Sequence, residues 1–390
     1  VLPTEARAAL TEATRIQNRV TETCFYTEAA LPMLWSGLRA LNLGESAGPS
    51  ADLARGYLSM GIIARVAGLG AVAESWCGRG VALAESTAKP YELAWIVQRD
   101  GAYRVMIADW KRAEAGSRRA LAIAATSGDR RQWEESRAIL AFVAAYQGKF
   151  RVAVAGFAEV HASGRLRDDR QVMAWGAEAQ AWCELRLGHG REAIALLEAS
   201  LDWSVQGGPV PDIINGHGLL ALAHLHRGER RLARESAERA LALITARRPV
   251  AYWIQQSIAA VAEVFLTLLA TASSRAERAE LRRLAARACK GARTFAQVFP
   301  FGEASALLWR GHHEQLTGEP RRARASWDAA RALAARLGML YERAQADLAI
   351  GRFARDVDER RRHLRAALAT FKVLEVAPDI ARARVELDRA

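Results

Sequence analysis

Small apolar residues recur along this chain at an interval of about forty positions. The repeats align on six anchor positions, namely Glu28, Gly68, Ala108, Gly148, Gly188 and Gly228. Five residues after each anchor stand Met33, Ala73, Ala113, Ala153, Ala193 and Ala233, and seven residues before it stand Thr21, Gly61, Gly101, Ala141, Ala181 and Ala221. Two packed helices need a small residue where they approach, because a larger side chain would hold the backbones apart. The pattern therefore predicts repeated helical hairpins.

The apolar and polar segments between the anchors predict nine hairpins and one terminal helix. Most of the prolines, such as Pro90 and Pro249, fall between the proposed units, where a missing backbone donor is tolerated. The hairpins are expected near residues 4–45, 51–86, 89–127, 130–165, 169–204, 210–246, 250–298, 302–337 and 338–376, with a capping helix over 378–390. A repeat array can run this long as one unit, so we expect a single domain over residues 1–390.

The seventh repeat is longer than the others. Its second helix fits the pattern with Glu280 as anchor, and the eighth repeat restores the register at Gly318. The first helix of the seventh repeat lies in the most apolar stretch, Ile254 to Ala272. This stretch is interrupted by Gln255, Gln256, Ser257 and Glu263. A membrane span tolerates such residues poorly, so we expect an amphipathic repeat helix and no membrane contact.

Composition places the protein in a reducing compartment and argues against a catalytic centre. The four cysteines, Cys24, Cys77, Cys183 and Cys289, have no disulfide or metal-ligand spacing. No phosphate-binding GxxxxGK[ST] loop and no HExxH motif occurs, and the paired acids sit at expected helix starts, where the helix dipole favours them. We therefore predict a cytoplasmic protein that is not an enzyme and has no cofactor and no metal. The first residue is Val1, so we expect a piece of a longer chain.

The chain is basic, with a formal charge of +12, and its charges are mostly arginines. Arginine is dense in the last third, at Arg321, Arg322 and Arg324 and again at Arg360, Arg361, Arg362 and Arg365. In a helical array most such residues form a solvated outer face, but an acidic partner or a polyanion remains an alternative.

Three segments resemble the tetratricopeptide repeat (TPR) family in the turn and the second helix. QGKFRVAVAGFAEV places Gly148, Ala153 and Phe157 at the family's positions, and LGHGREAIALLEAS and RGERRLARESAERA repeat the match from Gly188 and Gly228. The period of 40 exceeds the family's usual 34, and the usual proline at the repeat end is missing. The resemblance implies an all-α solenoid, a right-handed superhelix whose concave groove binds partner peptides or effectors.

Longer segments are similar to the sensor regions of large bacterial signalling ATPases. These include GLLALAHLHRGERRLARESAERALAL and SALLWRGHHEQLTGEPRRARASWDAARALAARLGM. In that family the repeats follow an ATPase module, often with a class III adenylate or guanylate cyclase or a protein kinase. The resemblance implies a C-terminal sensor or scaffold part, and none of the catalytic modules is in this sequence.

An aromatic stripe is the best candidate for a binding site. Positions thirteen, six and two before each anchor fall on one face of the first helix. In the middle repeats this face carries Trp95, Phe142, Tyr146, Trp175 and Trp182, together with Met106. Arg55 and Arg186 lie on the same face and could orient an acidic group. The alternative is that these rings fill the core of the longer helices.

Two classes of function follow from these observations. The favoured one is a non-catalytic sensory scaffold that binds a protein segment or small effector in its groove and regulates an attached or partner signalling module. The alternative is a nucleic-acid-binding solenoid that uses the arginine-rich C-terminal third. Nucleic acid is the less favoured partner, and self-association is open because an array leaves apolar faces at its ends.

Overall fold

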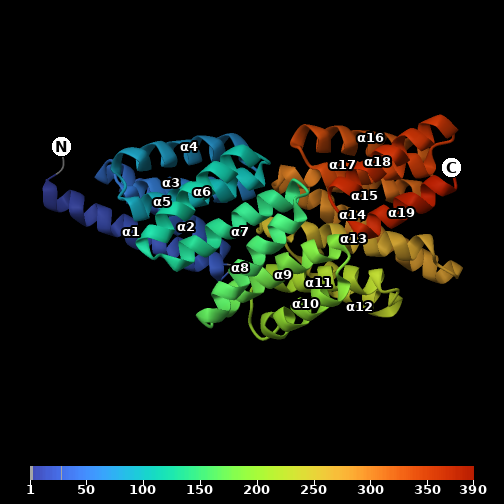
Figure 1. The fold of residues 1–390 in the computed structure, drawn as a ribbon. Helices are drawn as coiled ribbons and strands as arrows, with labels where there is room; N and C mark the ends of the chain where they lie inside the picture. The colour runs from blue at the N-terminus through green and yellow to red at the C-terminus, as the bar shows by residue number, and fades with distance from the viewer. Residues whose placement is uncertain (1–2, 28) are drawn as a thin grey trace. The chain divides into compact units, whose positions relative to one another are not determined.

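The computed structural model describes residues 3–27 and 29–390, which form helical hairpins throughout (Figure 1). The described residues make nineteen α-helices and two short 3-10 helices, with no strand among them. The predicted all-α fold of nine hairpins and a terminal helix is therefore confirmed.

The observed helices follow the predicted hairpins closely. In chain order they are α1 (Thr4–Tyr26), α2 (Ala30–Ala47), α3 (Ala51–Val66), α4 (Gly70–Thr87), α5 (Pro90–Met106), α6 (Trp110–Ser127), α7 (Arg130–Tyr146), α8 (Phe150–Leu166), α9 (Arg170–Leu187), α10 (Gly190–Ser204), α11 (Val210–His226), α12 (Arg230–Ala246), η1 (Tyr252–Ile254), α13 (Gln255–Ala270), α14 (Arg275–Val298), η2 (Pro300–Gly302), α15 (Glu303–Leu316), α16 (Pro320–Leu337), α17 (Leu340–Phe353), α18 (Val357–Val373) and α19 (Ala377–Asp388).

The helices group into two compact units. Unit 1 is Val1–Leu140 and unit 2 is Ala141–Ala390, so the boundary falls inside α7. The single domain over residues 1–390 stays a prediction.

The anchor positions are the turns inside the hairpins. Gly68, Gly148, Gly188, Gly228 and Gly318 all have positive φ angles, between 77° and 97°, and Ala108 has a φ of 62°. Glu28 lies outside the described residues. A left-handed residue after a helix lets the chain reverse while the last carbonyls find partners, and glycine reaches this conformation without steric cost. The forty-residue interval therefore comes from the repeated geometry of these turns.

The small residues lie where the helices of each hairpin touch. Ala73, Ala113, Ala153, Ala193 and Ala233 are all fully buried. A methyl group added to Gly101 of α5 would lie 2.6 Å from the Ser117 hydroxyl of α6. At the same positions Gly61 faces Cys77 and Gly311 faces Trp327, in both cases closer than any side chain allows. These contacts explain both small columns of the sequence.

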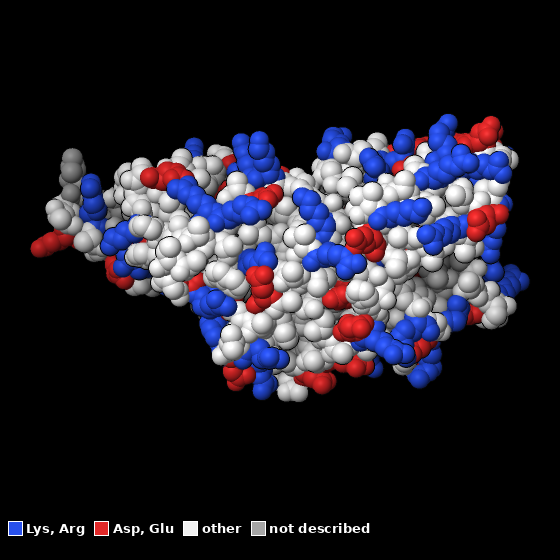
Figure 2. Space-filling model, viewed as in Figure 1, with Lys and Arg blue, Asp and Glu red and all other residues white. Residues whose placement is uncertain are grey.

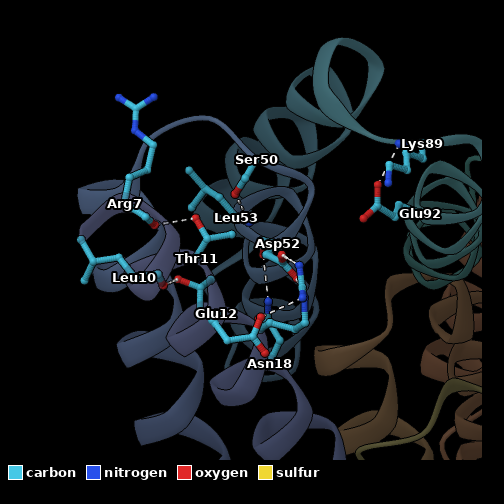
Figure 3. Close-up of polar contacts among 12 residues, drawn as sticks. Arg7, Leu10, Thr11, Glu12, Asn18, Ser50, Asp52, Leu53, Lys89 and Glu92 are labelled. Carbon is cyan, nitrogen blue, oxygen red and sulfur yellow. Dashed lines mark hydrogen bonds and ion pairs between the residues drawn. The ribbon is translucent and has the colours of Figure 1, made fainter. Parts of the chain in front are cut away.

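Polar contacts fix the start of α3 in unit 1 (Figure 3). The Ser50 hydroxyl accepts a hydrogen bond from the Leu53 backbone N–H at 3.2 Å, which caps the helix. Asn18 of α1 donates its side-chain N–H to the Asp52 carbonyl at 2.8 Å, and the Arg15 guanidinium also binds the Asp52 carboxylate. The first two hairpins are thereby held by polar as well as apolar contacts.

In unit 2 the last helices pack against much earlier ones. Helix α19 contacts α9, and a methyl group added to Gly188 would lie 3.4 Å from the Pro378 ring. Arg151 of α8 forms an ion pair with Glu375, next to α19. Helices separated by almost two hundred residues therefore meet within this unit.

Helix α13 is buried on nearly all sides. The segment Tyr252–Ala270 is long and apolar enough to cross a membrane, and 83% of its most apolar window is buried inside the protein. It contacts α11, α12, α14 and α15, and within it only Thr267 and Ala270 are exposed. The sequence predicted an amphipathic helix with one apolar face. The structure differs because four neighbouring helices surround α13.

Candidate interaction site

Four of the predicted aromatic residues meet in one cluster of unit 2. The Phe142 ring lies 6.2 Å from that of Tyr146, and Tyr146 lies 5.3 Å from Trp182, measured between centroids. Trp175 reaches the cluster through Trp253, at 6.4 Å. The cluster also includes rings from later helices and turns, which are Phe150, Tyr252, Trp253, Phe301 and Tyr341.

Burial differs along this aromatic cluster. Tyr146 is 1% exposed, Trp182 is 4% exposed and Phe142 is also buried. Trp175 and Trp253 are partly exposed. Buried edge-to-face rings contribute stability beyond their apolar area. The buried rings therefore form the support of this region, and Trp175 with Trp253 forms its accessible edge.

The other three predicted residues lie in unit 1. The Arg55 guanidinium stacks 4.0 Å from the centre of the Trp95 ring and donates a hydrogen bond of 3.1 Å to Glu22. Burial lowers the pKa of Arg55. Met106 is buried at the end of α5. Arg55 and Trp95 thus form a partly exposed pair, and Met106 is part of the core.

Arg186 joins a polar cluster that connects α9 with α17 and α19. Its Nη1 donates a hydrogen bond of 2.7 Å to the Tyr341 hydroxyl. The same hydroxyl lies 3.1 Å from Asp379 Oδ2, and Gln345 Nε2 donates to Asp379 Oδ1 at 2.9 Å. Arg382 Nη2 pairs with Asp379 at 2.8 Å. Side chains from three separate helices therefore share one network.

Glu263 of α13 balances the two arginines of this polar cluster. It lies 3.6 Å from Arg186 and 3.5 Å from Arg382. Burial opposes ionisation of this carboxyl, but the two positive charges outweigh it and hold its pKa below the usual range. Asp379 raises the pKa of Arg382. The network is thus two cations paired with two carboxylates.

Two histidines lie within reach of the charges of the polar cluster. The His226 side chain is exposed to solvent, yet desolvation by the surrounding protein lowers the pKa of its imidazole. His312 is partly exposed, and burial lowers its pKa to about 4. Arg382 has 45% of its side chain exposed and interacts with the same charged groups, Glu263 and Asp379.

Two buried atoms of the polar cluster lack hydrogen-bond partners among the described residues. They are Arg186 Nε, a donor, and Glu263 Oε2, an acceptor. Both side chains are at least nine-tenths buried. Leaving a buried polar atom unpaired costs free energy, so such atoms call for an explanation. For Glu263 Oε2 the explanation lies within the protein, because this atom forms the ion pair with Arg186 Nη1 at 3.6 Å.

The sequence pattern identifies part of this site and misses the rest. His226 and His312 stand two and six residues before their anchors, on the same face as Arg186 and Trp182, and the pattern could have included them. Glu263, Tyr341, Asp379 and Arg382 lie in the stretched seventh repeat or in the last helices, where the forty-residue register ends. No repeat signal marks those positions.

A second buried polar group lies close to Trp175. Glu178 of α9 accepts hydrogen bonds from Ser200 at 2.7 Å and from Asn215 at 3.0 Å. Burial and the neighbouring Asp212 raise the pKa of Glu178 well above its usual value. Burial also raises the pKa of Asp212 to about 7, although the Trp253 indole N–H points at its Oδ1 from 3.4 Å. Both carboxyl groups therefore hold a proton more readily than an exposed carboxyl does.

The described histidines, cysteines and acids do not gather around a metal position. No group of three or more such side chains in residues 3–27 and 29–390 is placed to hold a metal ion. His224 instead pairs with Glu229 at 2.6 Å. The four cysteines are free thiols, and burial raises the pKa of Cys289 to about 12.

The two arginine runs of the last third lie on α16 and α18, where Figure 2 shows dense positive charge on the visible face. Arg324 pairs with Asp328 at 2.8 Å and with Glu359 at 2.7 Å. Arg361, Arg362 and Arg365 are exposed. Part of this surface is therefore neutralised by the chain's own acids.

Comparison with known proteins identifies the fold. No model of a protein family matches the chain, and no curated protein matches it. A Rap protein complexed with Competence and Sporulation Factor is similar over 99% of this chain and 98% of its own, with a TM-score of 0.65 and 14% identity. Human IFIT1 in a dimer with PPP-AAAA is similar over 97% of this chain and 85% of its own, with a TM-score of 0.53 and 14% identity.

A second structure of human IFIT1, a dimer with m7Gppp-AAAA, covers 100% of this chain and 95% of its own, with a TM-score of 0.51 and 13% identity. Likeness at such low identity establishes the fold and leaves function open. The fold is that of TPR-like helical repeat proteins.

Proposed function

We propose that this protein is a non-catalytic interaction scaffold, and that the polar cluster of unit 2 binds a segment of a protein partner. The observation that carries the proposal is Arg382, which pairs with Glu263 and Asp379 while 45% of its side chain stays exposed. A peptide offers carbonyl and carboxylate oxygens that can accept hydrogen bonds from this guanidinium. A small effector with the same acceptor groups is the other form of this ligand class.

Exposed side chains of unit 2 fit such a ligand. Trp175, near the start of α9, and Trp253 supply partly exposed aromatic area at low conformational cost, as binding surfaces often do. His226 and Arg382 are exposed to solvent. The aromatic contacts would hold the ligand's apolar side chains, and the charged groups would set its direction. The Rap structure contains Competence and Sporulation Factor, which is compatible with a binding role for this fold.

Ligand binding at this place would also act on the fold. Arg186, Tyr341 and Asp379 hold α9 against α17 and α19, so a ligand that competes for Arg186 changes how firmly these helices are held. A ligand shifts a conformational equilibrium by its different affinity for the two states. In this way the scaffold would regulate a signalling module, attached or separate, such as the ATPase-linked cyclases and kinases that its repeats resemble, in the cytoplasm.

A display library of random twelve-residue peptides tests the proposal. Peptides selected on the purified chain should lose at least tenfold in affinity with Arg382→Ala, because that change removes the accessible cation of the polar cluster. Arg361→Ala, on the outer face of α18, is the matched control and should bind as the parent does. Thermal unfolding of each variant checks that the fold is intact. Peptides that bind a folded Arg382→Ala chain as tightly as the parent would contradict the proposal.

Nucleic-acid binding through the C-terminal arginines is the second candidate. The exposed Arg361, Arg362 and Arg365 on α18 favour it. If they bind phosphates, affinity for a single-stranded RNA should fall steeply with salt, and the triple alanine variant should reduce the slope of log affinity against log salt by about two. An unchanged slope in the triple variant would exclude this surface.

A further inference from the structure

The outward face of α2 carries a stripe of large apolar side chains. Leu31 is 80% exposed, Leu34 41%, Trp35 57% and Leu38 43%. Their spacing of three, one and three residues places them along one side of the helix. We call these four residues the α2 stripe. Single exposed apolar residues are common, but four in a row on one helix are not.

The other repeats provide an internal comparison for this stripe. The same four positions of α6 hold Lys111, Glu114, Ala115 and Arg118. Those of α12 hold Arg231, Arg234, Glu235 and Glu238. The equivalent face of α8 and of α10 carries one larger apolar residue each, Val154 and Ile194, so four large apolar residues are found at this face in α2 and not in these other second helices. The α2 stripe is not explained by the position of α2 at the end of the array.

The chemistry of the stripe fits a second copy of the same face. The spacing reads the same in both directions, so an antiparallel copy of α2 would place Leu31 opposite Leu38 and Leu34 opposite Trp35. Arg39 is the charged residue beside the stripe, and its guanidinium lies 5.1 Å from the centre of the Trp35 ring. In the antiparallel pair the two Arg39 side chains would lie roughly 13 Å apart along the helix axis, so their charges would not oppose pairing.

The apolar area is close to what a dimer needs. The exposed parts of the four side chains amount to about 450 Å² per copy, within the range where exposed patches mark interaction sites. Two copies would bury about 900 Å² through these residues alone, near the ~1,000 Å² that a specific interface must reach, before any neighbouring residue is counted. Ile16 and Val20 of α1, both exposed on the same hairpin, are available to add to it.

We propose that two copies of this chain associate through the α2 stripe, with the two helices antiparallel about a two-fold axis between Leu34 and Trp35. An isologous contact of this kind closes on itself and leaves no further copy to add. The dimer does not depend on the ligand site of unit 2. It would present two such sites in one particle, so a partner with two copies of the binding segment gains from both.

Sedimentation velocity of the purified chain over a range of about 1 to 100 µM tests the pairing. The chain should sediment as a dimer at the upper end and dissociate on dilution. Leu34→Glu and Trp35→Lys should each weaken the dimer by roughly a hundredfold, because each buries a charge against an apolar partner. Val152→Glu on α8 is the matched control, since Val152 is as exposed as Trp35, and it should leave the dimer unchanged.

Mixing the two charged variants tests the geometry. In an antiparallel pair Glu at position 34 of one copy meets Lys at position 35 of the other, so an equimolar mixture should recover the dimer that each variant alone has lost. A parent chain that stays monomeric at 100 µM overturns the proposal, as does a dimer that survives both charged variants. Failure of the mixture to pair would overturn the antiparallel arrangement. The substituted residues are exposed, and an unchanged melting temperature confirms that each variant is folded.

Discussion

Arg186 donates a hydrogen bond to the hydroxyl of Tyr341 across 155 residues of sequence. The bond is 2.7 Å long, and both side chains are buried. It joins α9 to α17, which is the first helix of the last hairpin in unit 2. The guanidinium also faces Glu263 and stacks on the Tyr341 ring, with 4.7 Å between its central carbon and the ring centre.

Replacement of Arg186 by alanine should destabilise unit 2 by about 3–5 kcal/mol. The reason is that Glu263 then remains buried with only the half-exposed Arg382 to balance its charge. Urea unfolding followed by tryptophan fluorescence measures the loss. Arg191→Ala on the exposed face of α10 is the control and should change stability by less than about 0.5 kcal/mol. Equal stability of the two variants would mean that the network around Arg186 contributes little.

Trp182→Ala should cost about 3–5 kcal/mol as well, because it empties a buried position between the Tyr146 and Phe150 rings. Trp175→Ala removes a partly exposed ring and should cost clearly less. Ala193→Trp serves as a positive control, since the fully buried Ala193 has no room for a larger side chain. If thermal unfolding of Trp182→Ala matches that of the parent, the ring contributes to binding and not to the core.

The pair of Glu178 and Asp212 predicts a pH dependence of stability. Folding raises the pKa of Asp212 to about 7, whereas the same carboxyl in the unfolded chain has a pKa near 4. Between these two values the folded chain keeps the proton and the unfolded chain releases it. Folding is therefore penalised progressively between about pH 4 and pH 7. Asp212→Asn removes the ionising group, so its stability relative to the parent should rise over this range.

The gain should approach no more than about 4 kcal/mol at pH 8 and should vanish near pH 4. Comparison of the two chains cancels the opposite contribution of His312, whose lowered pKa destabilises the fold as the pH falls through the range between the unfolded value and about 4. Asp202→Asn, at an exposed position of α10, is the control. A constant difference between parent and Asp212→Asn from pH 4 to 8 would contradict the raised pKa.

The turn positions predict two substitutions of opposite sign. Ala108 has a φ of 62°, so Ala108→Gly should relieve strain and stabilise unit 1 by about 1 kcal/mol. Gly228→Ala meets no atom within 4 Å and should cost about 1–2 kcal/mol through backbone strain alone. Gly148→Ala should cost more, because its methyl group would also lie 2.7 Å from Leu374. Differential scanning calorimetry of the three variants measures the order.

The repeat pattern was sufficient to predict the hairpins because it reports local geometry. A left-handed turn residue and a small contact residue are required in every hairpin, whatever its neighbours are, so Gly148 and Ala153 are visible in the sequence. The same register placed Trp182 and Arg186 on one face. The register alone could not predict the polar cluster, since the cluster depends on which later helices pack against α9.

Tyr341 and Asp379 illustrate the difference. Nothing in the local sequence indicates that their helices return to Arg186, because that contact depends on the accumulated rotation of the helices between them. The α2 stripe was also not predicted, although Leu31, Leu34, Trp35 and Leu38 are plain in the sequence. An apolar residue on a helix is normally assigned to the core, and only its exposure in the folded chain separates the two cases.

The tight contact of Gly311 with Trp327 bears on how such a repetitive chain avoids misassembly. Neighbouring hairpins resemble one another, so a helix could pair with the wrong copy while the chain is still folding. Trp327 fits only against a residue without a side chain, whereas Cys77 and Ser117 fill the corresponding place opposite Gly61 and Gly101 with far less volume. Unequal volumes at equivalent positions thus penalise exchange of partners between hairpins. The same steric mismatch would penalise recombining helices of this protein in engineered arrays.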